Sequence, residues 1–129
     1  MDGENSLIIS SKSGHLNIVN ALIRARASLN NEDRNGRSAL AHSCEAGHIE
    51  VVKTLIQAKA QVNKRIKERF LGKYKEFADS TSPLILGTIK GHFNIVSALI
   101  QANAKVNLVI LSYVQPTKPT RKVSYIANN

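Results

Sequence analysis

The sequence predicts an all-α fold, a solenoid of stacked helix-turn-helix units joined by β-hairpin-like loops. The first observation is a repeat, which reads GHLNIVNALIRARASLN from Gly14, GHIEVVKTLIQAKAQVN from Gly47 and GHFNIVSALIQANAKVN from Gly91. The second is its spacing, since the starts lie 33 and 44 residues apart and 44 is 33 plus 11. The third is that the aliphatic residues of each copy share one helical face. One such unit cannot bury its apolar face alone, whereas three stacked in register can.

Each unit is expected to hold two helices. The first is short and is headed by NSLI, SALA or SPLI. The glycine of Gly-His then fits a tight turn that requires positive φ. The second helix is amphipathic, and its buried face is expected to consist of Ile18, Leu22 and Ile23, of Val51, Leu55 and Ile56, and of Ile95, Leu99 and Ile100.

These features resemble the ankyrin repeat, whose pattern is D-x-x-G-x-T-P-L-H-x-A-A-x-x-G-H-x-x-V-V-x-x-L-L-x-x-G-A-x-V-N. The copy that begins at Asp33, DRNGRSALAHSCEAGHIEVVKTLIQAKAQVN, matches it best. The resemblance predicts repeat one over 2–34, repeat two over 35–63, an inserted basic and aromatic segment over 64–80, repeat three over 81–107, and an extended cap with a basic tail over 108–129.

The chain departs from the family pattern in two ways. Only the Leu of the T-P-L-H tetrapeptide is kept in all three copies and the His is missing from each, so the family's Thr–His hydrogen bonding is not expected. The family's Gly before Ala is replaced by Arg26, Lys59 and Asn103. Arg and Lys in a left-handed cap cost about 1 kcal/mol each relative to Gly. We therefore expect a stack of modest stability.

The 64–80 segment is an expansion of one loop tip between repeats. Ile66, Phe70, Tyr74 and Phe77 fall at i, i+4, i+8 and i+11, which favours a short helix docked by its apolar face. Gly72 interrupts this stretch, and a mobile basic loop is the alternative.

The net charge of +9, eighteen Lys and Arg against nine Asp and Glu, is unevenly distributed. The 64–80 segment has six basic and three acidic groups, and the 108–129 tail has three basic groups and no acidic one. Nucleic-acid or anionic-surface binding through these two segments is therefore the alternative function.

No residue set points to catalysis, so we predict no enzyme, no cofactor and no metal. His15, His48 and His92 occupy the same place in successive repeats, about 10 Å apart, which is too far to share a metal ion. They are expected to bond turn backbone. His42 could face the groove, with no cysteine or carboxylate beside it. Cys44 stands where the family has a small core residue and is expected to be a buried, inert thiol.

The resemblance implies a non-catalytic scaffold or adaptor that binds another protein through the concave surface of loop tips and first helices. Arg34 and Arg37 flank the turn-forming pair Asn35-Gly36 and are favoured as anchors. The full set of predicted contact residues is Lys12, Arg34, Asn35, Arg37, His42, Glu45, Arg69, Tyr74, Ile89 and Lys90.

The remaining predictions concern modification, location and assembly. The resemblance implies a structural role for Asn30, Asn63 and Asn107 and makes them candidates for asparaginyl hydroxylation. A single cysteine, no apolar run of about 20 residues and no signal-peptide pattern favour an intracellular location, cytoplasmic or nuclear. The chain is expected to be a monomer or part of a longer repeat array.

Overall fold

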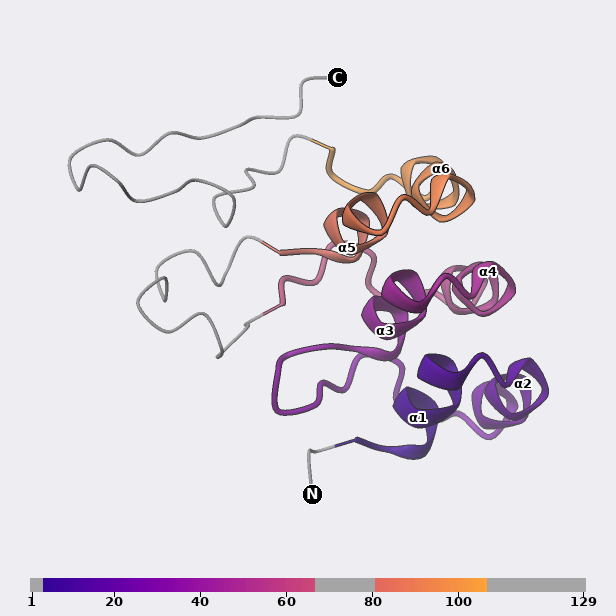
Figure 1. Ribbon diagram of the computed structural model, residues 1–129. Helices are drawn as coiled ribbons and strands as arrows, with labels where there is room; N and C mark the ends of the chain where they lie inside the picture. The colour runs from indigo at the N-terminus through magenta and orange to yellow at the C-terminus, as the bar shows by residue number, and fades with distance from the viewer. Residues whose placement is uncertain (1–3, 67–80, 107–129) are drawn as a thin grey trace.

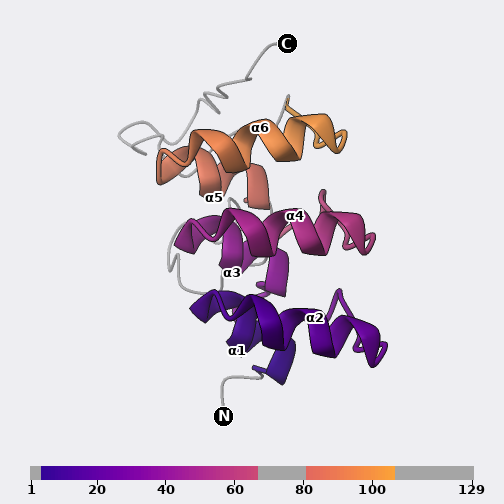
Figure 2. The same ribbon diagram turned by 90° about the vertical axis from the view of Figure 1, so that its right-hand side faces the viewer.

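The computed structural model describes residues 4–66 and 81–106. These residues form three stacked helix pairs (Figure 1), with α1, α3 and α5 in a row beside the loops and α2, α4 and α6 in a second row. Figure 2 shows the second row from its outer side. The stack confirms the predicted all-α solenoid. The helices are α1 (Ser6–Ser13), α2 (Leu16–Arg24), α3 (Ala39–Ala46), α4 (Ile49–Gln57), α5 (Pro83–Ile89) and α6 (Phe93–Gln101).

The inner helices α1, α3 and α5 share one kind of N-terminal cap. Asn5, Ser38 and Ser82 lie in extended backbone, and each side-chain oxygen accepts a hydrogen bond from the N–H three residues on, at 2.9, 3.3 and 3.3 Å. Such a cap contributes about 1 kcal/mol to helix stability. The three residues stand where the family pattern has Thr, so the cap is retained although the His of T-P-L-H is missing.

Each helix pair turns in the way that its sequence predicts. Gly47, at the end of α3, has a φ of +85°, and Gly91 after α5 has a φ of +73°. The outer helices also end in left-handed residues, since Arg26, Lys59 and Asn103 have φ of 60°, 73° and 65°. The predicted left-handed position is therefore occupied by a non-glycine residue in every unit.

One hydrophobic core runs through the whole stack. Leu7, Leu40 and Leu84 enter it from the inner row of helices, and Val19, Val52, Leu55 and Leu99 enter it from the outer row. Because α3 packs against both α1 and α5, the middle pair is covered on two sides. Each pair is thus stabilised largely by its neighbours.

The predicted insertion leaves and rejoins the stack at one point. Ile66 and Thr81 form an antiparallel bridge in which the Ile66 N–H donates to the Thr81 carbonyl at 2.8 Å. Because Ile66 forms this bridge, it is not helical, although the helix hypothesis placed it first on an apolar face. Its side chain is buried with Ala41 and Leu86. Phe70, Tyr74 and Phe77 lie outside the described residues, and the choice between helix and loop stays a prediction.

The helix pairs lie inside the three predicted repeats, whose exact boundaries stay predictions. Among residues 4–66 and 81–106, no helix is long and apolar enough to cross a membrane.

Candidate protein-binding groove

A tight turn projects from the stack between α2 and α3. Both the Asn35 and the Arg37 backbone N–H groups donate to Asp33 Oδ1, at 2.9 and 3.0 Å. The backbone closes the turn, because the Asp33 N–H donates to the Arg37 carbonyl at 3.1 Å and Gly36 takes a φ of +75°. The side chain of Asp33 therefore holds the Asn35-Gly36 tip in place.

The same carboxylate ties the turn to helix α3. His42 Nε2 donates to Asp33 Oδ2 at 2.7 Å, and both side chains are buried. Burial by itself would raise the pKa of Asp33, but the hydrogen bonds from His42 and from the Arg37 and Asn35 backbone outweigh it, so the pKa lies below its ordinary value. The expectation that His42 has no carboxylate beside it is wrong. The turn brings in Asp33, nine residues earlier in the chain.

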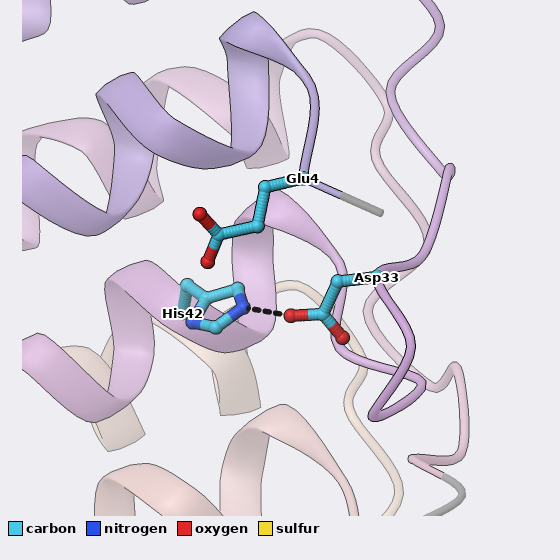
Figure 3. Close-up of side chains that lie close together, drawn as sticks. All are labelled: Glu4, Asp33 and His42. Atoms are coloured by element: carbon cyan, nitrogen blue, oxygen red, sulfur yellow. Dashed lines mark hydrogen bonds and ion pairs between the residues drawn. The ribbon is translucent and has the colours of Figure 1, made fainter. Parts of the chain in front are cut away.

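A third ionisable group, Glu4, comes to the same place from the segment that precedes α1 (Figure 3). Glu4, Asp33 and His42 each offer one ligand atom, and these atoms lie within 4.8 Å of one another. Carboxylate oxygen and imidazole nitrogen are the donors that zinc uses. Here both Asp33 oxygens already accept hydrogen bonds, and Glu4 Oε1 pairs with Lys12 Nζ at 3.1 Å. Asp33 and His42 therefore form a polar network that fastens the turn to α3, and the Glu4–Lys12 pair lies beside it.

Beside this network lies a groove of about 520 Å³ that crosses all three helix pairs. It is lined by Lys12 from α1, Asn35 and Arg37 from the turn, His42, Glu45 and Ala46 from α3, and Lys90 after α5. Six of these residues belong to the predicted contact set, and the fold brings them together although they are spread from position 12 to position 90.

Two other predicted contact residues in the described part of the chain, Arg34 and Ile89, are not among the residues that line this groove. Arg34 is exposed at the tip of the turn, and Ile89 is exposed at the end of α5 next to Lys90. Arg69 and Tyr74 lie outside the described residues. Sequence reasoning did not single out Asp33 as the residue that positions the groove. The sequence feature that could have identified Asp33 is its place at the start of the D-x-x-G stretch, with His42 nine residues later.

The groove carries charges of both signs, most of them in ion pairs. Arg37 forms an ion pair with Glu45, and both side chains are partly exposed. Lys12 pairs with Glu4, while Lys90 is exposed. Among the residues that line the groove, Lys12, Arg37 and Lys90 against Glu45 give a formal sum of 3 − 1 = +2.

Two histidines connect successive units at the edge of the groove. His48 Nε2 donates to the Lys12 carbonyl and His92 Nε2 donates to the Glu45 carbonyl, both at 3.1 Å. The expected structural role is therefore seen for both, but the acceptor belongs to the preceding unit. Each bond joins the start of one unit's second helix to the end of the preceding unit's first helix.

The asparagines at the loop ends make the same kind of connection. Asn30 Oδ1 accepts from the Gln61 N–H at 2.9 Å, and Asn63 Oδ1 accepts from the Lys105 N–H at 2.8 Å. Asn107 lies outside the described residues. Hydroxylation of Asn30, Asn63 and Asn107 stays a prediction.

Cys44 is a buried thiol, as predicted. Burial raises its pKa to about 12, so the thiol is neutral at physiological pH and is not a nucleophile there.

Comparison with known proteins agrees with the repeat and the helix pairs. A family model described as ankyrin repeats (3 copies) matches residues 1–67, just over half of the 129 residues. No curated protein matches the chain. The pair α5–α6 lies beyond the matched residues and continues the same stack. Ankyrin repeats are generally protein–protein interaction modules and are typically not enzymes. The chain belongs to the ankyrin-repeat family.

Proposed function

We propose that this chain is a non-catalytic scaffold or adaptor that binds a segment of another protein in the groove across α1, α3 and α5. The observation that supports this function is the composition of the groove, because one hollow is lined from all three helix pairs and from the turn. The His42–Asp33 and Arg37–Glu45 pairs hold its walls before any partner arrives. A preorganised site loses less entropy on binding.

The chemistry of the groove favours a partner segment that carries a carboxylate. Lys90 is exposed at one wall, and Lys12 is exposed at another with only a surface ion pair to Glu4. Exposed pairs of this kind are weak and exchange readily. Ala46 leaves room between them, and the exposed Ile89 offers an apolar contact at the rim.

The test fills the groove without removing any of its contacts. Ala46→Trp adds bulk at an exposed residue of the groove, and Ala21→Trp makes the same change at an exposed residue of the outer helix α2. Partners captured by the wild-type chain are identified, produced in pure form and titrated against all three proteins. We expect Ala46→Trp to weaken binding by at least tenfold, about 1.4 kcal/mol, and Ala21→Trp to leave it unchanged.

Equal affinity of the three proteins for every captured partner would contradict the groove as the binding site. A second measurement addresses the chemistry of the partner. If a carboxylate is recognised, Lys90→Glu weakens binding and higher salt weakens it further.

The alternative function, binding of nucleic acid or an anionic surface, rests on the 64–80 and 108–129 segments, most of which lie outside the described residues. It stays a prediction, as do Arg69 and Tyr74 as contacts and the cytoplasmic or nuclear location. It requires retention on an oligonucleotide column that falls steeply as salt rises.

A further inference from the structure

The first helix pair exposes apolar residues at positions that are buried in the other two pairs. Ile18, four residues after its Gly, is 50% exposed, whereas Val51 and Ile95 at the same place are 2% and 1% exposed. Ile9 on α1 is also 50% exposed, and its counterparts on α3 and α5 are buried. Those counterparts are His42 and Leu86. The preceding unit covers these positions in the second and third pairs, so Ile9 and Ile18 mark a face that no other part of residues 4–66 and 81–106 covers, here called the leading face.

His15 belongs to the same face. Its counterparts His48 and His92 are partly buried and donate to the Lys12 and Glu45 carbonyls of the preceding unit. His15 is exposed and makes no such bond among the described residues. The leading face therefore holds the apolar surface and the imidazole donor that the other two pairs use in a repeat-to-repeat contact.

The last helix pair shows the complementary pattern at the other end of the stack. Ile100 is 48% exposed, whereas Ile23 and Ile56 at the same place are partly buried and pack on the core. Thr88 is exposed, and its counterparts Ser11 and Cys44 are fully buried. In the first two pairs these positions are covered, wholly or in part, by the unit that follows, so Ile100 and Thr88 mark a second face that no other described residue covers, here called the trailing face.

Gly91 supplies an independent sign at the trailing face. A Cβ placed on Gly14 would lie 2.6 Å from the His48 ring, and one placed on Gly47 would lie 2.8 Å from the His92 ring. A Cβ on Gly91 would meet no atom of the described residues within 4 Å. The histidine ring of the following unit thus packs directly against Gly14 and against Gly47. Gly91 has a similar left-handed backbone, and no ring of the described residues packs against it.

We infer that the two faces bind each other, so that copies of this chain associate head to tail. The trailing face of one copy takes the place of a preceding repeat on the leading face of the next. His15 of one copy then lies over Gly91 of the other and donates to its Ile89 carbonyl, which corresponds to the Lys12 and Glu45 carbonyls inside the stack. Ile9 and Ile18 become buried against the surface around Ile100. This inference is independent of the groove and differs from the expectation of a monomer or part of a longer repeat array, which stays a prediction.

The arrangement makes a specific prediction about mass. A contact between two different faces leaves one face free at each end, so association continues instead of stopping at a dimer. In sedimentation equilibrium from about 10 to about 500 µM, the average mass of the full chain should rise beyond twice 14.1 kDa. Ile18→Glu and Ile100→Glu should each abolish this rise, because a charge on either face has to be desolvated.

Mixing the two variants gives the sharpest result. Ile18→Glu keeps an intact trailing face and Ile100→Glu keeps an intact leading face, so the mixture should form a one-to-one dimer and nothing larger. Asn17→Glu is the control, because it places the same charge one residue away, at a position that is exposed in all three units. It should associate like the wild type. Circular dichroism confirms that each variant is folded, which half-exposed sites permit.

Three outcomes would overturn the inference. They are a wild-type chain that stays at 14.1 kDa throughout, a mass that levels off at the dimer, and continued association of Ile100→Glu.

Discussion

The Gly-His turns allow backbone strain to be separated from a contact between repeats. Gly47 and Gly91 have similar left-handed conformations, with φ of +85° and +73°. An Ala at either position incurs the strain of a left-handed residue, about 1–2 kcal/mol, of which roughly 0.5 kcal/mol is recovered because Ala stiffens the unfolded chain. Gly91→Ala should therefore lower the free energy of unfolding by about 1 kcal/mol.

Gly47→Ala should cost more, because its new Cβ would lie 2.8 Å from His92 Cε1 and 3.0 Å from His92 Nε2. The ring has to move, and its 3.1 Å hydrogen bond to the Glu45 carbonyl is lost. A hydrogen bond of this kind contributes about 1 kcal/mol net, and loss of ring packing adds a similar amount. The total for Gly47→Ala is therefore about 2–3 kcal/mol.

Urea unfolding followed by far-UV circular dichroism measures both values by linear extrapolation, at protein concentrations low enough for a monomer. The cause is then isolated in a His92→Ala background, where Gly47→Ala should cost only the strain that Gly91→Ala costs. Equal losses for Gly47→Ala and Gly91→Ala in the wild-type background would refute the reasoning. So would an undiminished cost of Gly47→Ala once the His92 ring is absent.

Three further predictions concern single positions. Lys59→Gly should raise the unfolding free energy by about 1 kcal/mol in urea titrations, whereas Asn103→Gly should change it little, because Asn tolerates the left-handed conformation. Since the pKa of Asp33 is lowered by folding, the stability it contributes is present above its unfolded value of about 3.9 and is lost as pH falls through the folded value. Asp33→Asn should therefore lower stability at neutral pH and flatten its decline in acid, in pH-dependent thermal melts. Cys44 should resist a thiol reagent in the native protein and react fully once urea unfolds it, and rapid native reaction would contradict its burial.

The candidate groove was only partly accessible to sequence reasoning. The resemblance to ankyrin repeats places Lys12, Glu45 and Lys90 near the ends of the first helices, and these residues do line one hollow. The polar network behind it was not expected, because Asp33 reaches His42 only after the turn folds back on α3. The spacing of residues along a helix predicts which side chains share a face, but it does not predict which loop side chain contacts that face.

The sequence by itself determined the features that depend on a few neighbouring residues. Capping side chains start the inner helices and glycine ends α1 and α3 and follows α5, since each of these is decided within about one turn of helix. The spacing of aliphatic residues selects most of the buried face, but the expectation that Ile18 and Ile100 are buried is wrong, because both are about half exposed. The tertiary structure decided what depends on a neighbouring unit. Ile18 and Val51 occupy the same place in the repeat, yet one is half exposed and the other is buried. The difference comes from the unit that precedes Val51, because in a solenoid burial belongs to the interface between repeats and not to the repeat alone.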